Sequence, residues 1–450
     1  MINKSPNSSF RRAHWPQRSL ASFAPTLARL ASCAFALGAL TLGQTASAAQ
    51  TYSRTNKFFN GTGVAGTSTT YHSYRIPALL TGYQNTLFVF CEAHLNSASD
   101  WGTPIDLVYK RSTNNGGSWE PMKVLAGAAN TPAGSRGWTN PTAVYEPTWS
   151  GGPTMGRIHL FFNWHSESET GLDTLVYGDT RVYYMYSDDN GANWSARVNL
   201  TSTLNPSSLG LAYDNVGPGI GIRKAQTQAG LLIVPALSRN FYSLDHGAHW
   251  YYRRVPAGTS GHITNEGAIV ECLDGTLLRN DRPKGDTWDI AKTRWISYGE
   301  LIANSDGTAT GDFANYVSQA VLLDPKCQGS ILRYNFNSPD RVIFLNSDNT
   351  TDRCRMKVRI SYDDGLTWPR ARWLYEGTPP DNYPSVSNAQ DAGMGGYSSM
   401  IKHPSIGIVA GVEICEGGKD NYNNVAYARS IDLHMFNIEW INKGQSEAGF

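Results

Sequence analysis

One eight-residue pattern occurs four times in the chain, and it constrains the fold more than any other feature. The common form is Ser-x-Asp-x-Gly-x-x-Trp, with Asn in place of Asp in the first copy; the copies span residues 112–119, 187–194, 243–250 and 361–368. Aromatic or alternating runs such as Val182-Tyr-Tyr-Met-Tyr186 precede them, so we expect each copy to form a tight turn between two strands. In such a turn the Asp or Asn bonds its own backbone two residues on, the Gly supplies a positive φ, and the Trp packs into an apolar pocket.

The spacing of these turns predicts the architecture. Their first residues lie 75, 56 and 118 residues apart, and 118 is twice 59. A period near 60 with one degenerate copy is typical of a repeated small sheet, and radial repetition of such sheets gives a β-propeller. Six blades of about 60 residues use most of residues 49–450. We therefore predict an all-β fold in which residues 49–450 form a single six-bladed β-propeller catalytic domain.

Residues 1–48 have the composition of a leader. They carry five basic residues and no acidic one, and an apolar run over residues 30–42 precedes Ala46-Ser-Ala48. This order is typical of a secretory signal peptide, and the apolar run is too short for a membrane span. Leu30-Ala-Ser-Cys33 also resembles a lipoprotein cleavage box, although the apolar run continues beyond it. We expect an exported protein, secreted or periplasmic.

Charge and cysteine content exclude several classes of partner. Five of the 38 Lys and Arg residues lie in the leader, which leaves 33 against 37 acidic residues. This balance favours neither nucleic acid nor a membrane surface. None of the five cysteines beyond the leader forms a Cys-x-x-Cys pair, so we expect no metal site. We expect these cysteines to be buried free thiols, with a single disulfide as the alternative.

One arginine stands inside an otherwise apolar strand, at Tyr71-His-Ser-Tyr-Arg75-Ile-Pro-Ala-Leu-Leu80. A buried guanidinium needs a carboxylate partner or an anionic ligand. On this residue alone, an ion pair in the core and a ligand site explain the pattern equally well.

The Arg75-Ile-Pro77 strand, followed by the four Trp-terminated turns, resembles the bacterial exo-sialidases (neuraminidases), whose entry strand reads Phe/Tyr-Arg-Ile-Pro. The resemblance covers roughly residues 70–440. It implies a retaining exo-α-sialidase that hydrolyses terminal sialic acids from glycoproteins, glycolipids or oligosaccharides through a tyrosine nucleophile. It implies a sialylated glycoconjugate as the substrate and no cofactor, and we expect a monomer.

The resemblance also implies three arginines that bind the substrate carboxylate, which a guanidinium can grip with two parallel hydrogen bonds. Arg75 is the first, by its Arg-Ile-Pro setting. Arg282 is the second, because Asn280-Asp-Arg282 matches the family's Asn-x-Arg and an Asp274-Gly275 hairpin places it on the strand beside Glu266. Arg279, three residues earlier, is the alternative.

The third arginine is less well defined by the pattern. Family spacing selects Arg353, which precedes the last turn motif. Arg355 and Arg359 share its strand parity, and both are explained equally well as surface or ion-paired charges.

Tyr397, in Gly395-Gly-Tyr-Ser-Ser399, matches the family's nucleophile segment, with Glu266 as its base. A carboxylate nucleophile would be repelled by the carboxylate that sialic acid carries on its anomeric carbon. A neutral phenol avoids this repulsion but is weak, with a pKa of about 10, so an adjacent Glu must take its proton. Only the neighbouring glycines separate Tyr397 from the many tyrosines that serve packing.

Asp100 matches the family's acid/base, because it lies in a polar loop eleven residues before Arg111. It would protonate the leaving oxygen and then activate water, for which its pKa must be raised. Glu413, an acid within the apolar run of residues 408–413, corresponds to the Glu that orients the first arginine. Its alternative is an edge-strand acid that faces water.

The chain departs from the family at His94, where the family often has an arginine that helps to bind substrate. This substitution leaves open an enzyme for a related 2-keto sugar acid that lacks the N-acyl group. A trans-sialidase is a further alternative, for which Trp101 beside Asp100 is a candidate acceptor platform. A non-catalytic glycan-binding propeller predicts no such set of arginines, Tyr, Glu and Asp.

Overall fold

The structure is a computed structural model. It describes residues 48–60, 69–127, 135–166, 174–256, 264–284, 292–351, 353–374, 395–415, 428–447 and 450. The predicted signal peptide, residues 1–48, lies outside the described residues except for its last position. Residues 47–450 form one compact unit.

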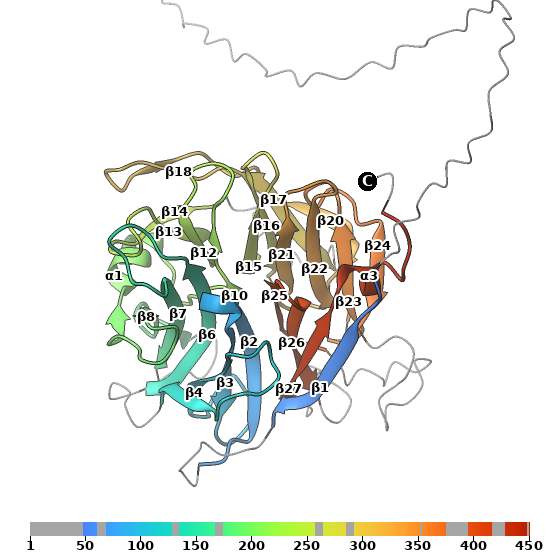
Figure 1. Cartoon of the computed structure of the whole chain (residues 1–450). Helices are drawn as coiled ribbons and strands as arrows, with labels where there is room; N and C mark the ends of the chain where they lie inside the picture. The colour runs from blue at the N-terminus through green and yellow to red at the C-terminus, as the bar shows by residue number, and fades with distance from the viewer. Residues whose placement is uncertain are drawn as a thin grey trace, which may run out of the picture. The chain divides into compact units, whose positions relative to one another are not determined.

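Antiparallel β-sheets make up almost all of the regular structure that is described, which confirms the all-β prediction. The first and last strands belong to one sheet, and Figure 1 shows them side by side, β1 in blue and β27 in red. In spatial order the strands of this sheet are β1 (Tyr52–Phe59), β27 (Ala428–Phe436), β26 (Gly407–Cys415) and β25 (Ser398–His403).

The next sheet has nine strands and consists of two meanders. They meet through one parallel pairing, Ile105 with Gly137, and β10 (Gly219–Ile220) adds to its second half. The first meander contains β2 (Ser73–Thr81), β3 (Leu87–His94), β4 (Ile105–Ser112) and β5 (Lys123–Ala126). The second contains β6 (Ser135–Glu146), β7 (Arg157–Ser166), β8 (Thr180–Ser187) and β9 (Val198–Asn199).

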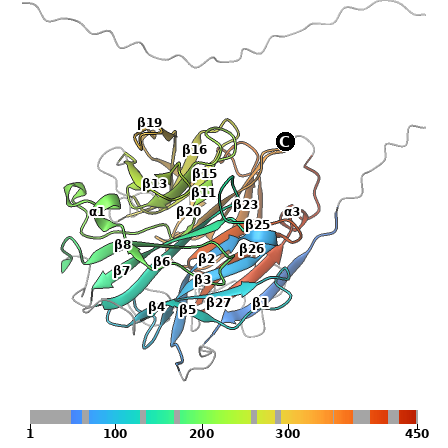
Figure 2. The same cartoon turned by 60° about the vertical axis from the view of Figure 1, so that its left-hand side comes forward.

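Three more four-stranded sheets follow along the chain, and Figure 2 shows them from a second direction. The first contains β11 (Ile222–Arg223), β12 (Leu232–Ala236), β13 (Arg239–Ser243) and β14 (Tyr251–Arg254). The second contains β15 (Thr264–Glu271), β16 (Leu277–Pro283), β17 (Thr293–Gly299) and β20 (Val317–Leu323). The third contains β21 (Ser330–Asn335), β22 (Arg341–Ser347), β23 (Met356–Ser361) and β24 (Arg370–Trp373). Short elements complete the described structure: β18 (Ile302–Ala303), β19 (Ala309–Thr310), α1 (Thr201–Leu204), α3 (Ile438–Ile441), η1 (Tyr83–Asn85) and η4 (Ser207–Leu209).

Each repeated motif forms a turn, as predicted, but its hydrogen bonds differ from the expected pattern. In the second copy the Ser187 hydroxyl donates to Asp189 at 2.9 Å and accepts the Gly191 N–H at 2.8 Å. Asp189 Oδ1 accepts the N–H of Asn193 at 2.8 Å, so the side chain reaches four residues on and not two. Asn190 and Gly191 both have positive φ, 55° and 78°, and this makes the turn tight enough for that bond.

Two tryptophans of the turns each join one meander to the meander before it. Trp250 packs edge-on against Phe161 of β7, with ring centroids 4.7 Å apart. Trp194 contacts Phe90 of β3 in the same way, at 5.9 Å. Because each of these partners lies in the preceding meander, the turns tie the sheets into a continuous core as well as closing hairpins.

We expect Asp189→Ala to lower the free energy of unfolding by about 1–2 kcal/mol at neutral pH, because the Ser187 hydroxyl and the Asn193 N–H lose their acceptor. Desolvation raises the pKa of Asp189, but the hydrogen bonds from Asn193 and Ser187 outweigh it, so the pKa is below its ordinary value. The contribution of the Asp189 carboxylate to the free energy of unfolding is therefore complete above the unfolded pKa of about 4. It is lost as the pH falls from there through the lower pKa of the folded state. Urea unfolding at pH 7 and pH 3 measures both effects; a loss that is the same at both pH values would contradict this account. Asp312→Ala, at a carboxylate that is 83% exposed in its pair with Arg253, is the matched control.

Strands β2 and β6 each carry a bulge at an X-Pro step, and these bulges position the site. The register of β2 shifts between Arg75 and Ala78, and Ile76 has a φ of 53°. The register of β6 shifts between Thr139 and Thr142, and Asn140 has a φ of 57°. A bulge turns a backbone N–H out of the ladder. Glu413 of β26 accepts the Ile76 N–H and Glu92 of β3 accepts the Asn140 N–H, at 2.7 Å in both cases.

Candidate active site

Glu266, Arg282 and Tyr397 form one buried hydrogen-bonded group. The hairpin of β15 and β16 turns at Gly275, whose φ is 86°, and this confirms that Glu266 and Arg282 lie on neighbouring strands. Arg282 Nη1 donates to Glu266 Oε2 at 2.6 Å and to the Tyr397 hydroxyl at 2.7 Å. The Tyr397 hydroxyl donates to Glu266 Oε1. All three residues are at most 6% exposed.

The surroundings of Tyr397 keep its phenol protonated. Burial raises its pKa well above the ordinary value of about 10, with a further contribution from Glu266, while Arg282 and Arg353 oppose the rise. A phenol in this state becomes a nucleophile only when a base removes its proton. Glu266 already accepts that hydrogen and is therefore placed to act as the base.

The glycines before Tyr397 allow neighbouring protein groups to approach the chain closely. A Cβ on Gly396 would lie 2.5 Å from Glu413 Oε2, and one on Gly395 would lie 2.9 Å from the Cα of Cys354. Glycine at these positions lets the chain pass between the two neighbours. It brings Tyr397 to the end of β25 against Glu413.

Glu413 is buried on β26, an inner strand of its sheet, so the edge-strand explanation is wrong. Its Oε1 accepts the Ile76 N–H and lies 3.7 Å from Arg75 Nε, while Oε2 accepts the Tyr397 N–H at 3.0 Å. Burial raises the pKa of Glu413, and Arg75 works against that rise. One carboxylate thus fixes the backbone beside both Arg75 and Tyr397, which is the support expected of a residue that orients an arginine.

Asp100 lies in the loop between β3 and β4 and forms an ion pair with Arg75. Desolvation raises the pKa of Asp100, but Arg75, His94, Arg353 and Arg136 outweigh it and lower the pKa to about 2. The structure therefore holds Asp100 ionised, whereas an acid catalyst needs a raised pKa. Its side chain is 58% exposed, so it has room to leave Arg75.

Arg353 contacts the same group of residues. Its guanidinium lies 5.3 Å from the centre of the Tyr397 ring, and Nη2 donates to the Lys326 carbonyl at 3.2 Å. Arg355 is exposed and lies over Trp373, and Arg359 pairs with Asp348. The structure therefore gathers Arg353 with the other predicted residues and leaves its two alternatives elsewhere.

The alternative to Arg282 also lies elsewhere. Arg279 is fully buried and pairs with Asp281 at 2.9 Å, and it donates to the Arg239 carbonyl at 2.7 Å. Because positions 279 and 282 differ by an odd number, their side chains leave opposite faces of β16. Only Arg282 faces Tyr397.

The sequence interpretation missed Arg136 and Glu92. Arg136 Nη1 donates to the Asp100 carbonyl, and its guanidinium lies 4.7 Å from the Trp101 ring. This contact occupies one face of Trp101, the ring considered as an acceptor platform. His94, considered as a substrate contact, is fully buried and bonds Glu92 and Ser99. No motif in the sequence indicates these contacts, because they join different strands and a loop.

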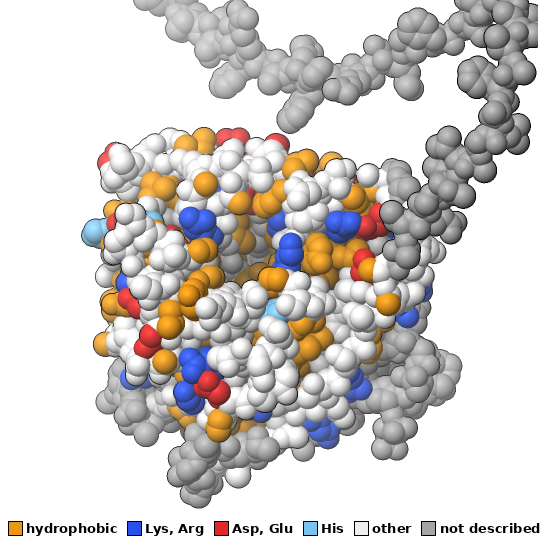
Figure 3. All heavy atoms as spheres, viewed as in Figure 1, with side chains coloured by type: hydrophobic (Ala, Val, Ile, Leu, Met, Phe, Trp, Pro, Cys, Tyr) orange, Lys and Arg blue, Asp and Glu red, His pale blue; other side chains and the backbone are white. Residues whose placement is uncertain are grey.

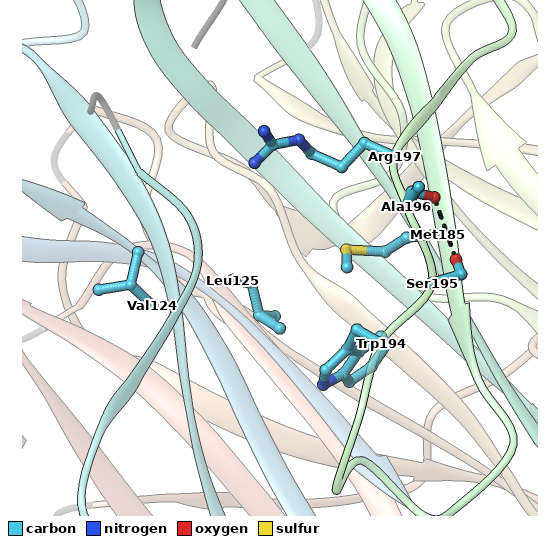
Figure 4. A pocket seen from close by; sticks show the side chains of 7 residues that line it. All are labelled: Val124, Leu125, Met185, Trp194, Ser195, Ala196 and Arg197. Atoms are coloured by element: carbon cyan, nitrogen blue, oxygen red, sulfur yellow. Dashed lines mark hydrogen bonds between the residues drawn. The ribbon is translucent and has the colours of Figure 1, made fainter. Parts of the chain in front are cut away.

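The face of the molecule seen in Figure 3 is hollowed near its middle, and Lys and Arg side chains lie around the hollow. A separate pocket of about 460 Å³ lies between β5 and the turn after β8 (Figure 4). Its lining consists of Val124, Leu125, Met185, Trp194, Ser195, Ala196 and Arg197. None of the predicted site residues lines it.

The described residues contain no cluster of three or more His, Cys, Asp or Glu that could bind a metal. Cys91, Cys272, Cys327 and Cys354 are buried, and no disulfide joins any of these four. Among the helices that the structure describes, none has the length and apolar character to cross a membrane.

Comparison with known proteins gives consistent matches. Residues 85–400 match the family model of the BNR repeat-like domain. An exo-alpha-sialidase of Aspergillus fumigatus is 36% identical over 403 residues, 83% of this chain and 86% of that protein. A sialidase of Bacteroides fragilis is 26% identical over 66% of this chain and 54% of that protein.

Solved structures agree on the fold. Hadza microbial sialidase Hz136 superimposes with a TM-score of 0.61 at 22% identity, covering 82% of this chain and 66% of that one. The intramolecular trans-sialidase of Ruminococcus gnavus gives a TM-score of 0.62 at 17% identity, covering 85% of this chain and 98% of that one. At these identities the likeness concerns the fold alone.

Proposed function

The chain belongs to the sialidase family with BNR repeats, and we propose that it releases terminal sialic acids with retention of configuration, using Tyr397 as the nucleophile. It is a glycoside hydrolase, and its substrate is a sialylated glycan. The observation that supports the mechanism is the position of the Tyr397 hydroxyl between Glu266 and Arg282.

In the first step, the Tyr397 oxygen attacks the anomeric carbon while Glu266 takes the phenol proton. The bond from that carbon to the leaving oxygen breaks, and Asp100 gives its proton to this oxygen. Arg75, Arg282 and Arg353 bind the carboxylate of the sugar, which keeps this charge from opposing the attack.

In the second step, a water oxygen attacks the same carbon from the side that the leaving group has vacated. Asp100, now a carboxylate, takes a proton from this water. The bond to Tyr397 breaks, and Glu266 returns the proton to the phenolate. Two inversions give net retention.

The contact of Asp100 with Arg75 has a consequence for binding. The substrate carboxylate needs Arg75, so it must displace Asp100. Once displaced, Asp100 loses its strongest cationic neighbour and lies near a second carboxylate. Both changes raise its pKa from about 2 toward the value that an acid catalyst requires.

We therefore expect the protein to take up a proton when sialic acid binds at pH 5, and Asp100→Asn to abolish this uptake. The Asn variant should also bind sialic acid on the order of 3- to 10-fold more tightly, because Arg75 no longer has a competing anion. Calorimetric titration in buffers with different ionisation enthalpies measures both quantities. Weaker binding by the Asn variant, or uptake that persists in it, would show that Asp100 does not compete for Arg75.

We also infer that the sheets form a six-bladed β-propeller over residues 49–450. The two meanders of the nine-stranded sheet count as two blades, and the four-stranded sheets count as four. The composition of residues 1–48 supports an exported protein, and we propose a monomer without a cofactor.

Hydrolysis of an aryl α-sialoside, followed by proton NMR, tests the proposed function. We expect the α-anomer of sialic acid to appear first and the β-anomer to grow in later by mutarotation. A β-anomer at the earliest time would mean inversion, and it would exclude the covalent route through Tyr397. Turnover of only the deaminated 2-keto analogue would instead support the alternative substrate class.

A further inference from the structure

Three consecutive carbonyl oxygens in the Asp100 loop each accept a hydrogen bond from a basic side chain. Arg75 Nη1 donates to the Ala98 carbonyl at 3.2 Å. His94 Nδ1 lies 3.1 Å from the Ser99 carbonyl oxygen. Arg136 Nη1 donates to the Asp100 carbonyl. The donors come from β2, β3 and β6, so three strands hold one short segment of loop.

The groups around His94 determine which of its ring nitrogens carries a hydrogen. A carbonyl oxygen can only accept, so Nδ1 must carry a hydrogen and donate it to Ser99. The other ring nitrogen, Nε2, lies 3.0 Å from Glu92 Oε2. Since His94 and Glu92 are at most 1% exposed, water does not compete for either bond.

Glu92 connects this histidine to the neighbouring meander. Its second oxygen, Oε1, accepts the Asn140 N–H at 2.7 Å, and that N–H is turned out of β6 by the bulge. The ring of His94 is thus fixed by a carboxylate that is itself fixed by backbone. This is how a supporting group orients a histidine in many sites.

Arg75 differs from the other two donors. It must turn to the substrate carboxylate during binding, and its contacts with Ala98 and Asp100 then weaken. The proposed mechanism assigns no step to His94 or Arg136, so they can hold the loop throughout the reaction.

We infer that His94, oriented by Glu92, is a positioning residue that holds the Ser99 carbonyl and thereby keeps Asp100 at the leaving group when substrate occupies Arg75. This inference rests on the proposed role of Asp100 as the acid. It assigns His94 to the loop and not to the sugar.

Two amide substitutions at position 94 each keep one of the two hydrogen bonds that the His94 ring makes. In His94→Asn the amide nitrogen is as many bonds from the Cα as Nδ1, so it can still donate to Ser99. In His94→Gln it is as many bonds away as Nε2, so it can reach Glu92 and not Ser99. The variants are otherwise alike in polarity. His249→Gln, at a histidine on the third motif turn whose side chain is 71% exposed, is the control.

The readout is kcat/KM for two α-sialosides, one with a nitrophenol leaving group and one with a sugar. This parameter reports the steps through attack by Tyr397. A sugar needs a proton from Asp100 to leave, whereas a nitrophenolate does not, and a positioned acid contributes about 10²- to 10⁴-fold. We expect His94→Gln to lower the rate on the sugar glycoside at least about tenfold more than on the nitrophenyl glycoside. His94→Asn should keep the ratio of the parent.

The Asp100→Ala variant, measured in parallel, tests separately whether Asp100 is the acid on which the inference for His94 depends. If Asp100→Ala lowers both rates equally, Asp100 is not the acid and His94 has no acid to position. If Asp100→Ala discriminates between the substrates but the Asn and Gln variants behave alike, the inference for His94 alone is overturned. Should His94→Gln fail to fold, Arg136→Met, which removes the donor to the Asp100 carbonyl, must show the same discrimination for the inference to stand.

Discussion

Tyr397→Phe should lower kcat for an aryl α-sialoside by roughly 10³- to 10⁴-fold, as expected when a residue that forms a covalent intermediate is removed. The substitution deletes one oxygen from a side chain that is 5% exposed and keeps the ring against Arg353. Glu266 and Arg282 remain paired with each other. Binding of sialic acid should therefore change little.

Steady-state kinetics and a binding titration on the same preparation check this prediction. Tyr334→Phe, at a partly buried tyrosine of β21, is the matched control and should keep the activity of the parent. Activity of the Tyr397 variant within tenfold of the parent would refute its role as the nucleophile. Loss of binding together with activity would instead indicate that the hydroxyl serves the carboxylate site.

Glu266→Gln should lower kcat/KM by about 10²- to 10⁴-fold, because an amide cannot take the phenol proton during attack. The loss in kcat should be largest for substrates with poor leaving groups, for which attack limits turnover. Burial keeps the Tyr397 pKa high, so raising the pH within the range that the fold tolerates should not restore the rate. A pH–rate profile of the variant tests this.

The double variant Tyr397→Phe, Glu266→Gln should be no slower than the slower single variant. Residues that act in one step are not additive in their effects. Multiplied losses in the double variant would mean that the two side chains act in separate steps, and Glu266 would then not be the base for Tyr397.

Local patterns predicted the parts of the site that depend on local structure. The four turns follow from Ser, Asp, Gly and Trp at fixed offsets, and the hairpin between Glu266 and Arg282 follows from Asp274-Gly275. The family's Asn-x-Arg ending selected Arg282 over Arg279, and the strand geometry separates the two, since an odd spacing on a strand places them on opposite faces.

Strand parity could not choose among Arg353, Arg355 and Arg359. The strand begins only at Met356, and Arg355 has a φ of 58°, so the alternation does not extend back to Arg353. The turn Asp reaches the N–H four residues on because two successive residues have positive φ, and the sequence signals only the Gly.

Contacts between residues that lie far apart in the chain could not be predicted from the sequence. The low pKa of Asp100 arises from Arg75, His94, Arg353 and Arg136, which stand on separate elements. The pairing of Glu92 with Asn140 depends on a bulge in β6 that alternating hydrophobicity does not reveal. The resemblance to known enzymes identified residue types at the site, and the structure supplied the contacts among them.

The most direct test of the account is to trap the covalent intermediate and locate it. A sialosyl fluoride with a second fluorine at C3 has a good leaving group but an electron-poor anomeric centre, so the intermediate should form and break down slowly. We predict that mass spectrometry of the peptides will find the sugar on Tyr397, and that Tyr397→Phe will acquire no label there. A sugar attached to Glu266 or Asp100, or hydrolysis of the reagent with no labelled protein, would contradict the tyrosine mechanism.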